Sequence, residues 1–402
     1  MWQGILGHDR IVERFRRAAA QGRLGGSFLF VGPPGVGKAT FARKLAQALL
    51  CQTRPESAFD PCNCCNGCHL VLAGAHPDLH IVSKPPDKSF IPLETFIGDR
   101  DRRMREGLIY ELGLKPFLGG RKIAIIDDAD YLHAESANCL LKTLEEPPPR
   151  SLIILIGTSP ARQLPTIRSR CQLVRFRPLA PAIMEEILLR EQVMANPAQA
   201  RRLAWLAEGS LERARQLADP QLWNFRKTLW TGLSQPRMDP LGLAEQVSAQ
   251  VESVGSEAAA RRDRLRLIVS MAAEYYRQVL YHHGEGESTP SIQGKSRGAR
   301  AASTRPSGGA PAFEGDPPPR SADSPLPGPG EPEVFRGAVP PECLDPQELQ
   351  AVQTCQASLE VVAECLDRCL QAAEQIDRNA NLTLLTECWL TELAQCAASL
   401  PT

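Results

Sequence analysis

The chain has 402 residues, with 46 Lys or Arg against 46 Asp or Glu, so its formal net charge at pH 7 is zero. This length is typical of two or three domains. The charge balance excludes a protein that coats nucleic acid through overall basicity, and leaves only local or shared contacts with DNA. The N-terminus lacks a signal peptide's basic and apolar regions, and no apolar run approaches membrane-spanning length. We therefore expect a cytoplasmic protein without membrane contact.

A glycine-rich stretch near the N-terminus predicts a phosphate loop. It follows the apolar run 28–31 and precedes a helical pattern over residues 41–50. In this strand–turn–helix context, backbone N–H groups and the positive end of the helix bind phosphate. The predicted nucleotide-binding residues of the loop are Gly32, Pro33, Pro34, Gly35, Val36, Gly37, Lys38, Ala39 and Thr40.

One position of this loop departs from the pattern G-x-x-x-x-G-K-[ST]. That pattern has a hydroxyl directly after the lysine, where it holds Mg²⁺. Here Ala39 follows Lys38, and the hydroxyl of Thr40 comes one residue late, about 100° around the helix. We expect a loop that can hold the phosphates of ATP but is poorly suited to metal-assisted hydrolysis. The alternative is a degenerate loop kept only for its fold.

A cluster of cysteines follows the phosphate-loop helix. In a cytosolic chain, 13 cysteines favour a metal site over a disulfide framework. Three of them are spaced C-x-x-C-x-x-C, and a fourth precedes them at the end of the helix. The pattern predicts a structural zinc ion held by Cys51, Cys62, Cys65 and Cys68. Cys64 is interpreted as a spectator and His69 as a substitute ligand, and unliganded or reactive thiols are the alternative.

Alternating apolar runs and helical patterns predict a doubly wound parallel sheet. After the first strand, further strands are expected at 79–82, 122–126, 152–156 and 172–176, with helical patterns at 91–115 and 136–145.

Polar residues end two of these strands, at the edge where open α/β sheets bind ligands. Asp127 is predicted to orient Mg²⁺ through water, and Asp128 to position an attacking water. The hydroxyl of Thr158 is predicted to reach the edge of the γ-phosphate, with a plain turn-forming role as the alternative.

The C-terminal half is predicted to be helical, with one interruption. Helical periodicity defines a small domain over 179–238 and a further domain over 239–283 and 341–402. Between them, residues 284–340 are dominated by Pro, Gly, Ser and Arg, which predicts a disordered insert.

Taken in order, these motifs resemble those of the delta-prime family of bacterial DNA polymerase III clamp-loader subunits. The resemblance rests on the phosphate loop, the cysteine cluster, and the stretches 127–130, 140–148 and 169–171. It implies an α/β AAA+ domain over 1–178 with a zinc module at 51–68, a helical lid domain, and an all-α collar domain.

The resemblance also implies a function in chromosomal replication. Partners would be the gamma/tau and delta subunits, with the sliding clamp and primed DNA reached through the assembly in the cytoplasmic, nucleoid-associated replisome. Arg170 matches the arginine finger that reaches a neighbouring subunit's ATP. An arginine fork suits this role because it stabilises charge on a transferring phosphoryl group.

Three departures from the family's motor subunits favour a stator that does not hydrolyse ATP itself. Ala39 replaces a hydroxyl, Asp128 replaces glutamate, and Glu212 replaces the sensor-two arginine. One alternative is an ATP-hydrolysing subunit of the gamma/tau type. An alternative of another class is a zinc-containing nucleic-acid-binding module with a vestigial phosphate loop.

Overall fold

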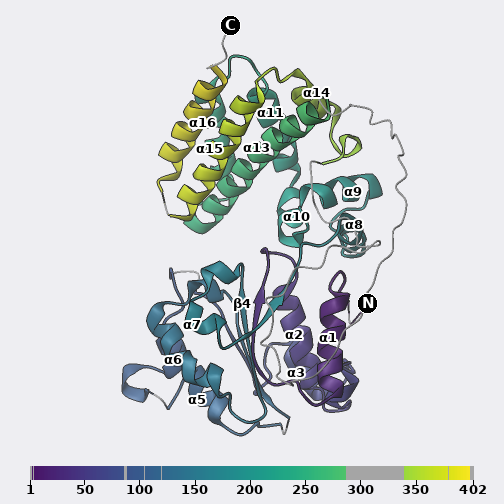
Figure 1. Ribbon diagram of the computed structural model, residues 1–402, viewed down its shortest axis with the longest axis vertical. Coiled ribbons are helices and arrows are strands. Elements are labelled where there is room, and N and C mark those ends of the chain that lie inside the picture. Colours follow the sequence, from purple (N-terminus) through teal and green to yellow (C-terminus); the bar gives the residue numbers. More distant parts are fainter. Residues whose placement is uncertain are drawn as a thin grey trace, which may run out of the picture. The chain divides into compact units, whose positions relative to one another are not determined.

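The computed structural model describes residues 2, 4–85, 88–103, 105–118, 120–286, 339–378 and 380–398. These residues divide into two compact units, which are described separately (Figure 1). The first unit holds the described residues up to Leu229 and those from 339 to Leu349. The second holds those from Trp230 to 286 and from Gln350 onward. Most of the predicted insert, residues 287–338, lies outside the described residues. The predicted domain boundaries remain predictions.

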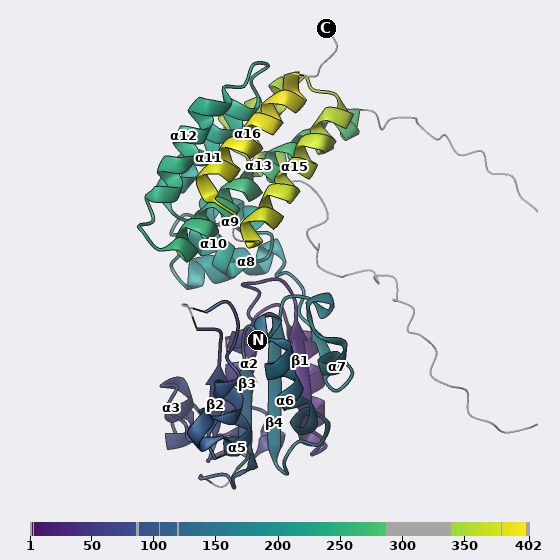
Figure 2. The same ribbon diagram turned by 90° about the vertical axis from the view of Figure 1, so that its left-hand side faces the viewer.

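A five-stranded parallel sheet forms the centre of the first unit (Figure 2). Its strand order is β2-β3-β4-β1-β5, and Leu29 of the central strand β1 pairs with Leu155 on one side and Leu173 on the other. The parallel sheet predicted from the sequence is thus confirmed. The strands are β1 (Gly26–Val31), β2 (Leu79–Val82), β3 (Lys122–Ile126), β4 (Ser151–Gly157) and β5 (Gln172–Arg175).

Helices cover both faces of this sheet because successive side chains of a strand point to opposite faces. On β1, Phe28 and Phe30 enter one buried core, whereas Leu29 and Val31 enter the other. The first core is closed by α1 (Asp9–Ala20), α2 (Lys38–Leu49) and α3 (Asn66–Leu72). The second is closed by α4 (Glu94–Ile97), α5 (Leu108–Gly113), α6 (Ala134–Glu145) and α7 (Pro165–Arg168).

The helical pattern predicted over 91–115 is wrong as a single element. Among the described residues of this stretch, which leave out residue 104, the helices are the short α4 and α5, with a 3₁₀ turn at Arg100–Arg102 between them. Gly98 and Gly107 have φ angles of +82° and +91°, which interrupt a right-handed helix. The two glycines also pack closely, since a Cβ on Gly107 would lie 2.6 Å from the Gly98 nitrogen.

Three further helices of the first unit begin at clear N-terminal signals. They are α8 (Pro181–Arg190), α9 (Pro197–Leu206) and α10 (Leu211–Leu217), followed by α11 (Pro220–Leu233), within which the boundary between the units falls. The Asn196 side chain caps α9 by accepting a hydrogen bond from the Ala198 N–H, and Ser210 caps α10 in the same way from Arg213.

The second unit is a bundle of helices. It contains α12 (Pro240–Glu252), α13 (Ala258–Gly286), α15 (Leu359–Asp377), α16 (Leu382–Ala398) and the end of α14 (Pro346–Thr354). Helix α13 packs on α15, and α16 packs on both α12 and α15. Its core includes Trp230, whose indole N–H donates to the Met271 carbonyl at 3.0 Å. The predicted fold class, an α/β domain with a cysteine module followed by helical parts, is confirmed. Among the described residues, no helix is long and apolar enough to cross a bilayer.

Candidate functional site

The predicted phosphate loop lies at the carboxyl edge of the sheet, between β1 and α2. Gly37 is the N-cap of α2 with φ +94°, and Gly35 has φ +72°. Helix α2 starts at Lys38, so its free N–H groups and its positive dipole end face the loop. The side chain of Ala39 packs against the core, whereas Thr40 is exposed. The position next to Lys38 therefore offers no metal-binding oxygen.

The amine of Lys38 is turned onto the loop's own backbone. Its Nζ donates hydrogen bonds to the carbonyl oxygens of Gly32 at 2.6 Å and Pro33 at 2.7 Å. Burial lowers the pKa of Lys38, and three carboxylates act in the opposite direction, those of Asp127, Asp130 and Glu212. The ammonium group that would bind an outer phosphate thus donates its hydrogen bonds to carbonyl groups of the loop itself.

The acidic strand end makes local contacts. Asp127 Oδ1 accepts the backbone N–H of Asp128 at 3.0 Å, and Asp128 Oδ2 accepts that of Lys84 at 3.4 Å. Asp128 has φ +56°, and burial together with the charge of Asp127 raises its pKa. Asp128 therefore lies against the end of the neighbouring strand β2, although both acids occupy the predicted edge of the sheet.

Asp130 binds Thr158, the third predicted element of the site after the loop and the acidic strand end. Its Oδ2 accepts hydrogen bonds from the backbone N–H of Thr158 at 2.9 Å and from the Thr158 hydroxyl at 2.5 Å. Its Oδ1 accepts from the Gln163 side-chain amide. The Thr158 carbonyl in turn accepts the N–H of Gly32 at 3.1 Å. The hydroxyl predicted to reach a γ-phosphate is therefore bound to a carboxylate.

Two side chains next to the loop were not singled out from the sequence. Asp130 is the fourth residue of the acidic stretch 127–130, and that clustering of acids was the available signal. His8 is buried, and its Nε2–H donates to the Val36 carbonyl at 2.7 Å. Burial is the largest influence on the pKa of His8 and lowers it. No local pattern marks His8, because its partner lies far along the chain.

The N-terminus of α10 lies directly on the phosphate loop. The Leu211 N–H donates to the Gly35 carbonyl at 2.9 Å. A Cβ on Gly35 would lie 2.2 Å from Ser210 Oγ and 2.8 Å from Glu212 Cβ. Arg213 is directed elsewhere and pairs with Glu208 at 2.7 Å. An acidic residue, and not an arginine, thus stands beside the loop.

Arg170 belongs to a separate surface group. It follows α7, and its Nε donates to Glu145 Oε2 at 3.1 Å, while a guanidinium NH donates to the Thr166 carbonyl at 3.2 Å. Its side chain keeps 31% of its surface exposed, and Glu145 keeps 61%. The pair is accessible to solvent, so the ion pair is readily exchanged for another anionic partner.

The four predicted zinc ligands converge. The Sγ atoms of Cys51, Cys62, Cys65 and Cys68 all lie within 4.8 Å of one another. The Cys51–Cys65 and Cys62–Cys68 sulfurs are each 3.9 Å apart. A tetrahedral ion with bonds of about 2.3 Å to sulfur spaces the sulfurs at about 3.8 Å, so this set fits zinc.

The surroundings of the cluster act on its thiols in opposite directions. Burial raises the pKa of the Cys68 thiol well above its usual value. Backbone N–H groups of Cys64 and Cys65 lower the pKa of the Cys62 thiol to about 5. Cys64 itself is exposed and lies outside the cluster, as does His69. Close packing brings α3 against the end of α2, since a Cβ on Gly67 would lie 2.6 Å from the Leu50 carbonyl.

Comparison with known proteins connects this geometry to a family. Residues 7–180 match the protein family described as DNA polymerase III, delta subunit. The delta-prime subunit of Bacillus subtilis DNA polymerase III is 35% identical over 195 residues, which is 48% of this chain and 54% of that protein. The delta-prime subunit of Pseudomonas aeruginosa is 35% identical over 57% of this chain and 60% of its own length. The predicted resemblance to delta-prime subunits is confirmed.

The family match, over residues 7–180, lies within the first unit of the chain. A tau subunit of Escherichia coli DNA polymerase III is also similar, at 31% identity over 54% of this chain and 32% of that protein. The chain is thus similar, over about half of its length, to both delta-prime and tau subunits of DNA polymerase III. The chain spans little more than half the length of the first two relatives.

Proposed function

We propose that this protein is a clamp-loader subunit of DNA polymerase III that serves as a stator. It would assemble with gamma/tau and delta subunits in the cytoplasm and help them place a sliding clamp on primed DNA. It would not hydrolyse ATP, and it would lend Arg170 to the nucleotide of a neighbouring gamma/tau subunit. The relationship to delta-prime and tau subunits supports membership of this assembly.

The non-hydrolysing role is supported above all by the contacts that the phosphate loop makes within the protein. Lys38 is bound to the carbonyls of Gly32 and Pro33, and the start of α10 lies on Gly35. Glu212 adds a negative charge beside the loop, where an anionic phosphate would be repelled. Without a hydroxyl at position 39, the loop also lacks a side-chain ligand for Mg²⁺.

A structural zinc ion forms part of the same proposal. Cys51, Cys62, Cys65 and Cys68 would hold it and leave no open coordination position, so the ion would tie α3 to the end of α2 rather than take part in catalysis.

The test is ATP turnover by the purified chain, alone and mixed with gamma/tau and delta. We expect no turnover by the chain alone, and a fall of about 10³-fold or more in partner-dependent turnover when Arg170 is replaced by Ala. Arg162, an exposed arginine of a nearby 3₁₀ turn, provides the matched control, and Arg162→Ala should leave turnover unchanged. Turnover by the isolated chain that disappears in Lys38→Ala would instead identify a motor subunit.

A further inference from the structure

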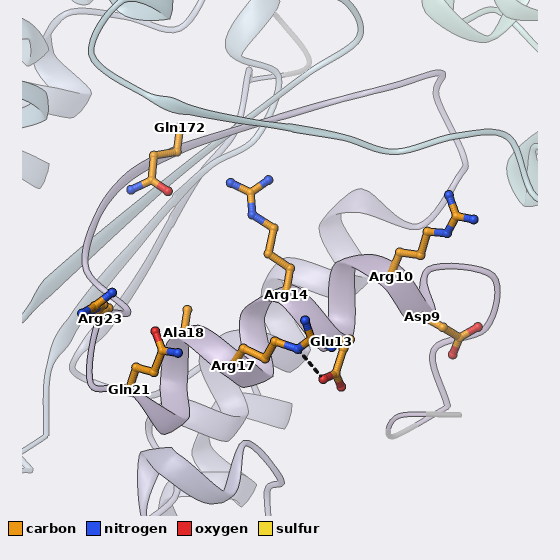
Figure 3. A pocket seen from close by; sticks show the side chains of 9 residues that line it. All are labelled: Asp9, Arg10, Glu13, Arg14, Arg17, Ala18, Gln21, Arg23 and Gln172. Carbon is orange, nitrogen blue, oxygen red and sulfur yellow. Dashed lines mark hydrogen bonds and ion pairs between the residues drawn. The ribbon is translucent and has the colours of Figure 1, made fainter. Parts of the chain in front are cut away.

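An arginine-rich groove lies between α1 and the edge strand β5 (Figure 3). It has a volume of about 910 Å³. Its polar donors are four arginines and two glutamines, Arg10, Arg14, Arg17, Arg23, Gln21 and Gln172. Asp9 and Glu13 also border it, so positive charge remains in excess. A chain with no net charge therefore carries a local basic surface here.

The stability of α1 accounts for Arg17, which lies in the last turn and pairs with Glu13, but not for Arg10 and Arg14. Arg10, Arg14 and Arg17 recur at four- and three-residue steps, so like charges are neighbours on one side of the helix. Arg10 also lies in the first turn, where the helix dipole disfavours a cation. Glu13 pairs with Arg16, which is not part of the lining, at 3.0 Å and with Arg17 of the groove at 2.8 Å. In Figure 3, the Arg14 side chain extends away from this pair on the side of Gln172.

The guanidinium and amide groups that line the groove are suited to bind a row of several phosphates. Guanidinium groups bind phosphate through two parallel N–H donors, and amides such as those of Gln21 and Gln172 add further donors. Arg10 and Arg17 are seven residues apart, which is about 10.5 Å along the helix axis. A DNA strand in a duplex carries about three phosphates over that distance.

The remaining lining argues against other anionic partners. Among the described residues that line the groove, none is aromatic, and aromatic side chains are what unpaired bases stack on. Ala18 is the single apolar residue of that lining, so the groove offers no apolar pocket for the anchoring side chains by which a protein partner would dock. We propose that this groove binds the sugar–phosphate backbone of duplex DNA without regard to sequence. The proposal requires no partner subunit and is independent of the stator role.

The test measures binding of the full chain to a labelled mixed-sequence duplex of about 24 base pairs by fluorescence anisotropy at 50 to 200 mM NaCl. A plot of the logarithm of the association constant against the logarithm of the salt concentration should have a slope of about −3. The double variant Arg14→Gln/Arg23→Gln should bind about tenfold more weakly at 50 mM and reduce the size of this slope by about two. Arg14→Lys/Arg23→Lys should keep most of the slope, since the charges remain.

A matched pair of exposed arginines in the second unit gives the control. Arg237→Gln/Arg378→Gln changes the net charge equally and should leave both affinity and slope unchanged. Thermal melting checks that each variant is folded. Three results would overturn the proposal: no binding to the duplex at 50 mM salt, equal weakening by the control pair, or tighter groove-dependent binding of single-stranded DNA or polyglutamate than of the duplex.

Discussion

The backbone N–H of Leu211 donates a 2.9 Å hydrogen bond to the carbonyl oxygen of Gly35, which joins the start of α10 to the phosphate loop. The absence of a side chain on Gly35 is what permits this approach, since a Cβ there would lie 2.2 Å from Ser210 Oγ. The glycine-rich loop, whose backbone is suited to bind phosphate, is thus in contact with α10 of the same protein.

Gly35→Ala should be strongly destabilising. The φ angle of +72° costs an L side chain about 1–2 kcal/mol, and the overlap with Ser210 adds about 1–3 kcal/mol. Gly22→Ala is the control, because Gly22 has φ +65° but no atom within 4 Å of an added Cβ. Urea unfolding should show a clearly larger loss of free energy for Gly35→Ala. Equal losses would mean that the α10 contact is not maintained in solution.

Removing the acid beside the loop should improve nucleotide binding. Glu212→Gln is expected to strengthen binding of a fluorescent ADP analogue about tenfold, which corresponds to about 1.4 kcal/mol, because a carboxylate no longer repels the phosphates. The gain should disappear when Lys38→Ala is added, since the amine would then no longer bind phosphate. Glu186→Gln, at an exposed position of α8, should have no effect. An unchanged affinity in Glu212→Gln would show that the charge is not what excludes the nucleotide.

The sheet was predictable because its strands are buried on both faces and therefore appear as short apolar runs. Residues 122–126 are all buried, and β3 has the predicted bounds. The error over 91–115 arose because apolar spacing persists through Gly98 and Gly107, whose positive φ angles depend on tight packing between the two loops. Periodicity contains no information on that packing.

The candidate site was predictable where its residues are close in sequence. The four cysteines lie within residues 51–68 and the loop pattern within residues 32–40, and the four thiols do converge. The contacts of Asp130 with Thr158, of His8 with Val36 and of Leu211 with Gly35 join distant segments. Such pairings are set by the fold, so the sequence placed Thr158 at the correct edge without showing that its hydroxyl faces a carboxylate.

The cysteine cluster should hold one zinc ion per chain. Cys51→Ser is expected to lose the metal, measured by elemental analysis, and to lower the melting temperature by about 10 °C or more, because structural zinc contributes directly to folding. Cys64→Ser removes an exposed thiol outside the cluster and should change neither value. Retention of stoichiometric zinc by Cys51→Ser would contradict the proposed ligand set.

The last prediction concerns the dependence of stability on pH. Burial lowers the pKa of His8 below its ordinary value of 6.5, so the unfolded chain binds a proton at a higher pH than the folded chain does. His8 therefore supports stability above about pH 6.5, and this contribution falls as the pH drops toward its folded pKa, by at most about 1.4 kcal/mol per pH unit.

Urea unfolding between pH 7.5 and pH 5 should show this loss, and His8→Gln should reduce the slope while keeping an N–H donor near the Val36 carbonyl. Burial also lowers the pKa of His76 and His80, so part of the slope should remain in this variant. If His8→Gln and the wild type lose stability in parallel, His8 is not buried as a neutral donor to the loop.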